Sequence, residues 1–444
     1  MNKEFHKKQN FFSFSDIDSE RKDRIMKFTS TEATPAPHVP PGVLRLTGAA
    51  KEDIPMYHIQ TMNKISPVGL NRFPSELYEV GDAVQDPQGI LVRSAKLLDL
   101  EFNPSLLAIA RAGVGVNNIP LDRCAAAGIP VFSTPGANAN AVKELVICAM
   151  LMGSRDIPGA IRWVREQAAS GVDVSTVVEK GKSAFIGPEL YKKTLGIIGL
   201  GAIGSIVANT AISLGMDVYG YDPFLSVDTA LRLDRHVHVV KDINDLYKRS
   251  DYITMHIHYT EKTAHMIDAD AIAAMKRGVR VINLARGEIV DDEAMLTALD
   301  TGMVAAYITD FPNNRLLTAP HVIAMPHLGA STPESEQNCA AMAVDTLRDY
   351  LESGNIRSSV NLPEMTMDRS GVQRLCVLHK NVPGMLANIT SLFGRDGVNV
   401  ENLSNKSRGD YAYTMVDLGS KVGDNVIEDV RRTANVIRVR SLEW

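Results

Sequence analysis

The sequence predicts an α/β protein built on doubly wound parallel sheets, with a smaller ferredoxin-like unit at the C-terminus. Three observations support this prediction. Strand-like apolar runs alternate with helical patterns from about Tyr57 onward. A glycine-rich turn follows one of these runs and opens a helix. The residues after about 371 follow the order β-α-β-β-α-β. At 444 residues the chain is long enough for two or three domains.

The first group of elements lies between residues 56 and 193. Two apolar strands, 89–93 and 107–111, each end on an arginine, and a shorter strand follows at 129–132. An amphipathic helix is predicted from Val142 to about Arg155, because its apolar residues recur at helical spacing. Residues 171–193 are polar and rich in glycine and lysine, so we expect an irregular connection there.

The remaining elements fall into two groups. The first is the alternating pattern of a parallel sheet, which ends in a long helix at 332–353. A loop at 355–371 leads to the second group, the ferredoxin-like unit. The expected strands of the sheet are 195–200, 217–221, 252–257, 279–284, 305–308 and 322–324. The C-terminal unit is expected as strand 374–379, helix 385–393, a hairpin turning at 408–410, helix 425–432 and strand 436–440.

The composition excludes several classes of protein. The formal net charge of -5 provides no basic surface, so we expect no nucleic-acid partner. No apolar run approaches the roughly 18 residues that a membrane span requires, so we expect no membrane partner. The four cysteines are scattered and lack the spacing of metal ligands, which predicts no metal site, reduced thiols and a cytoplasmic location. They are Cys124, Cys148, Cys339 and Cys376.

Residues 1–55 differ from the rest of the chain. They carry mixed charges and a proline cluster at 35–41, and they lack the apolar stretch of roughly 7–15 residues that a signal peptide needs. We predict a disordered N-terminal tail, or an early start with Met56 as the true first residue. A regulatory role for the tail stays open.

A dinucleotide site is predicted at the turn Gly199-Leu-Gly-Ala-Ile-Gly204. The pattern GxGxxG is weak evidence alone, but here it follows an apolar strand, opens a helix and precedes a second strand that ends on Asp222. Gly199 permits the tight turn, Gly201 lets the backbone approach a pyrophosphate, and Gly204 lets the helix pack on the strand. Asp222 can accept from both ribose hydroxyls and would repel a 2′-phosphate, which favours NAD over NADP.

Polar residues follow several strands of this sheet, where ligands of open α/β sheets bind. His256 and His258 follow one strand, Arg286 and Asp310 follow two others, and His327 follows the last. Oxidation of a 2-hydroxy acid needs a cation for the carboxylate and an acid/base for the hydroxyl proton. Arg286 and His327 have these properties, because a guanidinium binds carboxylate bidentately and imidazole titrates near neutral pH. His258 is better explained as a solvated strand end.

Three blocks of this sequence resemble the D-isomer-specific 2-hydroxyacid dehydrogenases, in the family's own order. They are Lys193-Thr-Leu-Gly-Ile-Ile-Gly-Leu-Gly-Ala-Ile-Gly204, Ile282-Asn-Leu-Ala-Arg-Gly-Glu-Ile-Val-Asp291 and Pro326-His-Leu-Gly-Ala-Ser-Thr332. The resemblance implies two Rossmann-like domains, with Arg286 and His327 as catalytic residues. It further implies a substrate-binding domain at 56–150 with a return helix at about 328–353, and an NAD-binding domain at 151–327. The implied cofactor contacts are Gly199, Gly201, Ala202, Ile203, Gly204, Asp222, Leu284, Ala285, Arg286, Thr309 and Asp310.

One departure from the family stands out. Its members usually carry a glutamate that hydrogen-bonds the catalytic histidine, in a segment resembling Asp-Val-Phe-x-x-Glu-Pro. When Phe311 is aligned with that segment, the glutamate position holds Asn314 and the nicotinamide-facing aspartate position holds Thr309. We therefore expect His327 to work without the usual carboxylate, with Asn314 or Asp310 as possible support. A pH–rate profile with a normal acid limb that Asp310→Asn abolishes would contradict this expectation.

The resemblance further implies the substrate. Members specific for 3-phosphoglycerate place phosphate- and substrate-binding residues at positions that match Arg93, Ser94 and Asn138. The implied reaction is the oxidation of 3-phospho-D-glycerate with NAD, the first step of L-serine biosynthesis, in a homodimer or homotetramer. Two alternatives stay open: a hydroxypyruvate or glyoxylate reductase, which needs no phosphate clamp, and a non-catalytic regulator that senses NADH.

The unit at 372–444 resembles an ACT domain, a small-ligand regulatory module. The resemblance rests on Asn381-Val-Pro-Gly-Met-Leu386 between a strand and a helix, and on Gly397-Val-Asn399 after that helix. In serine-sensitive members a histidine and two asparagines bind L-serine across paired ACT domains. They match His379, Asn381 and Asn399, which implies feedback inhibition by serine. An ACT domain that serves only assembly is the alternative.

Overall fold

A computed structural model of the chain describes residues 56–444 and contains three separate sheets. The predicted tail at 1–55 lies outside the described residues. Two of the sheets are parallel and the C-terminal one is antiparallel, which confirms the predicted fold class. In the described part of the chain, no helix has both the length and the apolar character that crossing a membrane would require.

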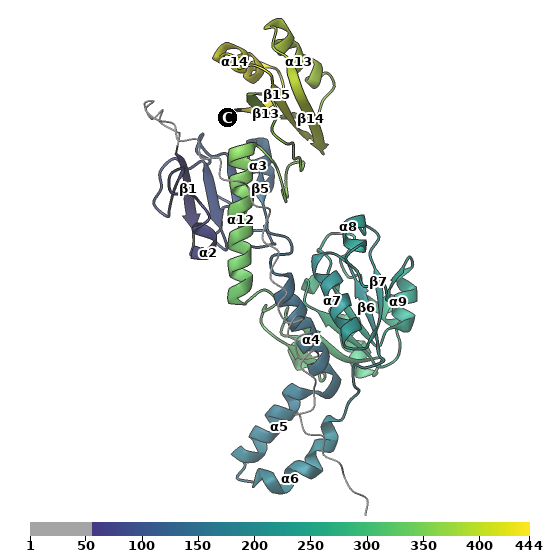
Figure 1. The fold of residues 1–444 in the computed structure, drawn as a ribbon. Coiled ribbons are helices and arrows are strands. Elements are labelled where there is room, and N and C mark those ends of the chain that lie inside the picture. Colours follow the sequence, from purple (N-terminus) through teal and green to yellow (C-terminus); the bar gives the residue numbers. More distant parts are fainter. Residues whose placement is uncertain (1–55) are drawn as a thin grey trace, which may run out of the picture. The chain divides into compact units, whose positions relative to one another are not determined.

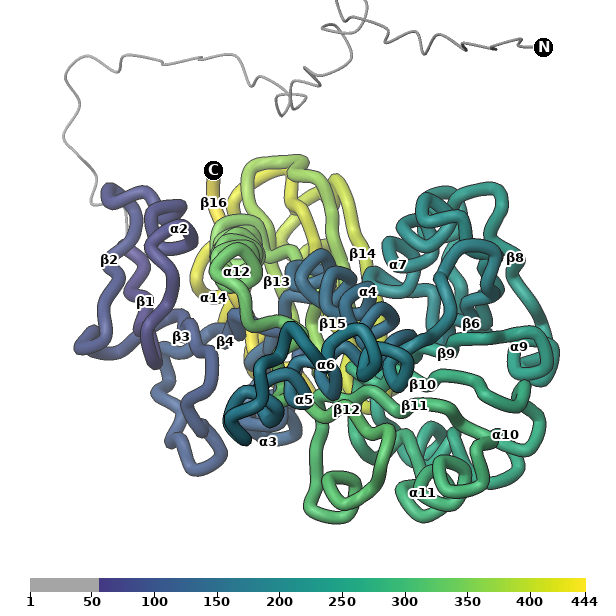
Figure 2. The backbone as a smooth tube through the Cα atoms, turned by 90° about the horizontal axis from the view of Figure 1, so that it is seen from below, coloured from purple at the N-terminus to yellow at the C-terminus, as the bar shows by residue number. Residues whose placement is uncertain are grey.

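The first sheet has the strand order β2-β1-β3-β4-β5, and every pairing in it is parallel. Its core contains one face of the long helix α12 (Pro333–Ser353), in which Ala340, Val344 and Leu347 are buried. A helix that follows the second sheet in the sequence therefore completes the core of the first domain, as expected of the predicted return helix (Figure 2). The other elements are β1 (Tyr57–Met62), α2 (Pro67–Leu70), β2 (Tyr78–Gly81), β3 (Gly89–Val92), β4 (Ala108–Arg111), α3 (Leu121–Ala126) and β5 (Val131–Phe132).

The second sheet is a seven-stranded parallel sheet of order β12-β11-β10-β9-β6-β7-β8. Helices pack on both of its faces: α4 and α7 share a core cluster with one face, and α9, α10 and α11 share a second cluster with the other. The order reverses between β6 and β9, and in open α/β sheets ligands bind outside the carboxyl ends of the strands at such a reversal (Figure 2). The strands are β6 (Thr194–Ile198), β7 (Asp217–Tyr221), β8 (Val237–Val240), β9 (Tyr252–Met255), β10 (Val279–Asn283), β11 (Val304–Thr309) and β12 (Val322–Ala324). The helices are α4 (Ala139–Arg155), α7 (Ala202–Ser213), α8 (Val227–Ala230), α9 (Ile243–Arg249), α10 (Ala269–Ala273), α11 (Asp292–Asp300) and two short 3₁₀ turns, η2 (Gly287–Ile289) and η3 (Leu316–Thr318).

The predicted irregular connection at 171–193 is wrong in its first half, which is helical. Helix α5 (Ile157–Ala169) and helix α6 (Val174–Gly181) form a pair, followed by the 3₁₀ turn η1 (Lys182–Phe185) (Figure 1). Asp173 caps α6 by accepting a hydrogen bond from the Ser175 N–H at 3.0 Å. The polar composition is that of a helix with no buried residue, so composition alone could not separate it from a loop.

The third sheet has the order β14-β15-β13-β16 and carries α13 and α14 on one face. This arrangement confirms the predicted β-α-β-β-α-β order of the C-terminal unit. Its elements are β13 (Gln373–Lys380), α13 (Met385–Arg395), β14 (Val400–Arg408), β15 (Tyr411–Leu418), α14 (Asp424–Arg432) and β16 (Val436–Glu443).

The opposite face of the third sheet packs on the first domain, where Cys376, Leu378 and Met415 share a core cluster with α12. The last five carbonyls around the end of α12 all accept hydrogen bonds from the C-terminal segment. The donors are Arg440 to Tyr350 and Leu351, Arg369 to Glu352, Arg374 to Ser353 and the Tyr413 hydroxyl to Gly354. These donors satisfy the carbonyls that a helix end leaves free, so α12 is capped by the C-terminal unit.

Candidate active site

The glycine-rich turn has the geometry that a bound pyrophosphate requires. Gly199 has φ +90°, and a Cβ there would lie 2.7 Å from the His256 carbonyl oxygen. A Cβ on Gly204 would lie 1.9 Å from the Gly199 oxygen, so only glycine lets α7 pack on β6. A Cβ on Gly201 would meet no atom within 4 Å, which leaves the backbone open at the N-terminus of α7. Amide groups and the helix dipole at this end favour a phosphate.

Asp222 lies at the end of β7 and is held by two backbone groups. Its Oδ2 accepts from the Leu200 N–H and its Oδ1 from the Phe224 N–H, both at 2.9 Å. Each carboxylate oxygen keeps a further lone pair, so a ribose diol can donate to both. The turn and this carboxylate therefore fit the two ends of an NAD adenosine-pyrophosphate unit.

The ends of β10, β11 and β12 bring the two predicted catalytic residues together around Phe311. The Arg286 guanidinium carbon lies 5.8 Å from the centre of the Phe311 ring. The His327 and Phe311 ring centres are 4.7 Å apart. Arg286 is further fixed by its backbone, because the Asn283 side chain donates to the Arg286 carbonyl oxygen at 2.8 Å. A cation and an imidazole thus flank one aromatic ring at the carboxyl edge of the sheet.

Asp310 is the buried carboxylate nearest to this pair, with 1% of its surface exposed. Its Oδ2 accepts from the Leu328 and Gly329 N–H groups at 3.1 and 3.0 Å, directly after His327. Its Oδ1 is buried and has no hydrogen-bond partner. Burial raises the pKa of Asp310, and the Gly329 N–H and the charge of His327 oppose this shift. An unpaired buried carboxylate oxygen is costly and indicates a site for a donor.

Asn314 and Thr309, which occupy the positions of the family's glutamate and aspartate, make no hydrogen bond to the His327 imidazole in the described structure. Asn314 is exposed and makes no hydrogen bond to His327. Its neighbour Asn313 turns instead to α11, where it donates to Asp292 at 2.6 Å. Thr309 is fully buried, and its hydroxyl accepts from the Phe311 N–H at 3.0 Å. Of the two supports expected from the sequence, only Asp310 interacts with His327.

The predicted substrate residues lie at the carboxyl ends of the first sheet and at the start of α4. Arg93 follows β3, and its Nη2 lies 2.5 Å from Glu336 Oε1 on α12. Ser94 is exposed, and its N–H donates to the Asn63 side chain at 3.1 Å. Asn138 precedes α4 but does not cap it, and its buried Oδ1 has no hydrogen-bond partner. This oxygen can accept from a ligand hydroxyl.

One residue of this cluster was not predicted from the sequence, Arg111 at the end of β4. Its Nε donates to the Arg93 carbonyl oxygen at 3.0 Å. Burial lowers the pKa of Arg111, and the nearby positive charges of Arg286 and Arg93 add to this effect. Arg111 therefore lies near both Arg93 and Arg286, and a group of positive charges of this kind favours an anionic ligand. The sequence did contain a signal for Arg111, because it stands at the end of a strand just as Arg93 does.

The three predicted regulatory residues do not form one site within a single chain. His379 is buried and its Nε2 lies 2.9 Å from the Thr414 hydroxyl, while Asn381 donates to Gly409 at 3.1 Å. Asn399 lies at the other end of the sheet, where its carbonyl oxygen accepts from the Gly419 N–H. His379 pairs with Ala412 and Gln373 with Leu418, so the two ends are about 20 Å apart at roughly 3.4 Å per residue.

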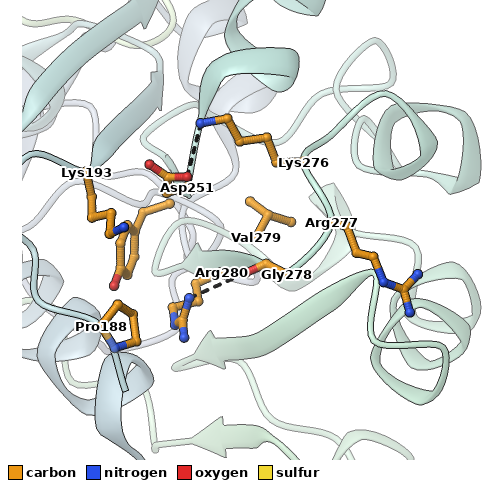
Figure 3. Close-up of a pocket in the computed structure, with 9 residues that line it drawn as sticks. Pro188, Lys193, Asp251, Lys276, Arg277, Gly278, Val279 and Arg280 are labelled. Atoms are coloured by element: carbon orange, nitrogen blue, oxygen red, sulfur yellow. Dashed lines mark hydrogen bonds and ion pairs between the residues drawn. The ribbon is translucent and has the colours of Figure 1, made fainter. Parts of the chain in front are cut away.

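Two cavities lie along the second sheet, and only one of them is lined by predicted active-site residues. The larger, about 760 Å³, is lined by Asp310, Phe311 and the predicted catalytic residue His327, together with acidic residues of η2 and α11. The smaller, about 110 Å³, lies at the amino ends of β6, β9 and β10 (Figure 3). There Lys276 pairs with Asp251 at 3.0 Å, which ties a loop to the sheet edge. None of the predicted site residues lines the smaller cavity.

Comparison with known proteins defines the class. Residues 147–329 match the family described as "D-isomer specific 2-hydroxyacid dehydrogenase, NAD binding domain". The D-3-phosphoglycerate dehydrogenase of Escherichia coli is 31% identical over 380 residues, which are 82% of this chain and 89% of that protein. The chain belongs to the D-isomer specific 2-hydroxyacid dehydrogenase family, and its seven-stranded sheet is the core of the NAD-binding domain.

Particular relatives include the D-3-phosphoglycerate dehydrogenase of Synechocystis sp., 36% identical over 326 residues, or 71% of this chain. The chain spans little more than half of that relative (56%) and of the one from Methanocaldococcus jannaschii (55%). Among solved structures, the NAD+-bound 3-phosphoglycerate dehydrogenase of Entamoeba histolytica is 26% identical with a TM-score of 0.54, covering 69% of this chain and 99% of that chain.

Proposed function

We propose that this protein oxidises 3-phospho-D-glycerate to 3-phosphohydroxypyruvate with NAD, as the first step of L-serine biosynthesis. The observation that carries the proposal is a group of three arginines, in which Arg111 lies near both Arg93 and Arg286. Arg286 in turn lies close to the same Phe311 ring as the imidazole of His327. The substrate has a carboxylate at one end and a phosphate at the other, so it needs cations at both. The names of the relatives support the same substrate.

In the proposed mechanism, the Arg286 guanidinium holds the substrate carboxylate and polarises the developing carbonyl. His327 removes the proton of the C2 hydroxyl as general base, and it returns this proton in the reverse direction. Bound NAD supplies the acceptor for the hydride that leaves C2. Asp310 holds the backbone after His327 and adds a negative charge that stabilises the imidazolium. The free Oδ1 of Asp310 can also accept from the cofactor's carboxamide.

The phosphate end tests the substrate assignment. Arg93 and the Ser94 hydroxyl are the proposed phosphate ligands, and Asn138 accepts from a substrate hydroxyl. Replacing Arg93 with alanine should lower kcat/KM for 3-phosphohydroxypyruvate by about 100-fold, because hydrogen bonds between charged groups contribute about 1.5–3 kcal/mol. For hydroxypyruvate kcat/KM should stay within about twofold of wild type. Equal losses for both substrates would favour a reductase without a phosphate clamp.

The assembly we propose is a homodimer or homotetramer in the cytoplasm. Helices α5 and α6 contain no buried residue, yet they expose Ile157, Ile161, Val164 and Val178. An exposed apolar surface of this kind is typical of a protein interface. A second copy of the chain is the proposed occupant, because the same surface on both subunits can form a two-fold interface.

We also propose feedback inhibition by L-serine through the C-terminal unit, acting as an ACT domain. His379 and Asn381 lie at one end of its sheet and Asn399 at the other, so a site that uses all three needs two copies. This geometry supports a serine site between subunits. Titration of activity with L-serine, in wild type and in Asn381→Ala, tests it. An absence of any serine effect in wild type would leave assembly as the role of this unit.

A further inference from the structure

The proposed phosphate ligand Arg93 already holds an anion within the chain. Its Nη2 lies 2.5 Å from Glu336 Oε1, and among residues 56–444 neither side chain has another ion pair or hydrogen bond to a side chain. Glu336 belongs to the first turn of α12, whose N-cap Thr332 lies five residues after His327. The side chains are 43% and 46% exposed, so both can move without disturbing a packed core.

A carboxylate in this position has two possible effects on substrate binding, with opposite signs. It can orient Arg93, so that other guanidinium N–H groups face the phosphate, and then its loss would weaken binding. Alternatively it occupies the N–H groups that the phosphate needs and repels the phosphate charge, and then its loss would strengthen binding. The Arg93 guanidinium has five N–H donors, and in the described structure no second side-chain acceptor fixes its plane. This favours the second effect, in which Glu336 competes with the phosphate for Arg93.

We propose that Glu336 is a displaceable counter-anion that determines how the site discriminates phosphorylated from unphosphorylated substrates. Glu336 pairs with Arg93 when the phosphate position is empty and gives way when a dianionic phosphate binds. It pairs again as the phosphorylated product leaves, so that the cation is never left without a partner. An unphosphorylated 2-hydroxy acid leaves the pair intact. This inference rests on the proposed function, because it assumes that Arg93 receives the substrate phosphate.

The test compares Glu336→Gln with a matched control, Glu334→Gln. Both substitutions remove one negative charge from the first turn of α12 and keep the side-chain shape, but Glu334 makes no contact with Arg93. We expect Glu336→Gln to lower KM for 3-phosphoglycerate about three- to tenfold relative to the control, since an exposed ion pair contributes up to about 1 kcal/mol and repulsion adds to it. KM for hydroxypyruvate should be equal in the two variants.

Inhibition by inorganic phosphate provides a second readout that does not depend on turnover of a phosphorylated substrate. With hydroxypyruvate as substrate, the inhibition constant of phosphate should fall in Glu336→Gln and not in Glu334→Gln. A KM for 3-phosphoglycerate that rises in Glu336→Gln, or matches the control, would overturn the inference while the proposed function stands. Wild-type enzyme that does not turn over 3-phosphoglycerate at all would overturn the proposed function, and the inference with it.

Discussion

At the residue scale, the active site contains a carboxylate whose burial opposes stability. Asp310 has two oxygens in different situations: Oδ2 accepts two backbone N–H groups and Oδ1 is buried without a partner. The pKa of Asp310 is raised above its ordinary value of 3.8, mainly by burial. A folded-state pKa above the unfolded one means that the folded protein holds the proton more tightly. The free energy of unfolding therefore falls as pH rises from the unfolded-state pKa through the raised folded-state pKa, because the ionised form of Asp310 is the destabilised one.

This residue predicts a trade-off between stability and activity in Asp310→Asn. The amide oxygen can replace Oδ2 as acceptor for both N–H groups, while the buried charge is removed. We expect a higher Tm than wild type at pH 8 and a smaller difference at pH 4, close to the ordinary carboxyl pKa, where the raised pKa lets Asp310 take up its proton. We also expect kcat to fall about tenfold or more, because the His327 imidazolium loses a nearby negative charge. Thermal unfolding and kcat, measured at both pH values, test this prediction. A Tm below that of wild type at pH 8 would contradict it.

Arg286 predicts a second effect at this scale. Arg286→Lys keeps the charge but loses the planar fork that matches a carboxylate. We expect kcat/KM for 3-phosphoglycerate to fall by about 100-fold, on the scale of removing a donor to developing charge. The Kd of NADH, measured by fluorescence, should change much less than kcat/KM, since the expected contacts to the pyrophosphate at Gly201 and to the ribose at Asp222 are unchanged. Arg286→Lys with wild-type kcat/KM would remove Arg286 from the mechanism.

Residue types and strand ends could be predicted from the sequence, but the partners of these residues could not. The glycine turn, Asp222, Arg286 and His327 could be found because their positions follow apolar strands. Glu336 lies 243 residues from Arg93 along the chain, and only the return of α12 to the first sheet brings them together. The contact of Asp310 with the backbone after His327 likewise depends on the register of β11 and β12. Long-range pairing leaves no local pattern in the sequence.

At the element scale, the α5–α6 pair gives a test of assembly. Ile161 is 50% exposed on the apolar side of α5, although the helix buries none of its residues. We expect Ile161→Asp to shift the protein from dimer toward monomer, because it places a charge in the proposed interface. Arg162→Asp, on the polar side of the same helix, is the control and should leave the mass unchanged. Analytical ultracentrifugation measures both, and a dimeric Ile161→Asp would place the interface elsewhere.

The capped end of α12 gives a second test at this scale. The Tyr413 hydroxyl donates to the Gly354 carbonyl oxygen at 2.6 Å, and both groups are buried. Tyr413→Phe leaves that carbonyl without a partner, which costs about 1–3 kcal/mol and should lower Tm by a few degrees. Tyr411→Phe is the matched control, because the Tyr411 hydroxyl makes no hydrogen bond in residues 56–444. Equal Tm values for the two variants would show that the cap does not contribute to stability.

Elements with a clear hydrophobic periodicity were predicted well, and elements without buried residues were predicted poorly. The strand 217–221 and the helix beginning after Thr332 match the structure closely, because buried apolar faces impose a visible pattern. Helix α6 was missed, since none of its residues is buried in a core. Strand β8 (Val237–Val240) was also missed, because it lies at the sheet edge and contains no buried residue.

At the scale of the whole molecule, the proposed serine site requires two chains. Asn381→Ala and Asn399→Ala each remove a contact from every site of their own homo-oligomer. In a mixed oligomer, however, one site combines the intact Asn381 of one chain with the intact Asn399 of the other. We expect each variant alone to lose serine inhibition, and a refolded equal mixture to regain part of it. If the mixture stays insensitive while wild type is inhibited, these residues do not share a site across subunits.

The central claim is that this chain is an NAD-dependent dehydrogenase of 3-phosphoglycerate. The most direct measurement is the initial rate of NADH formation from 3-phosphoglycerate and NAD, with the keto product removed as it forms because the oxidation is uphill. We predict saturable NADH formation with NAD and at least tenfold lower kcat/KM with NADP, because Asp222 repels the 2′-phosphate. His327→Gln should reduce the rate by about 100-fold or more. No NADH formation by wild type, or an equal rate in His327→Gln, would contradict the claim.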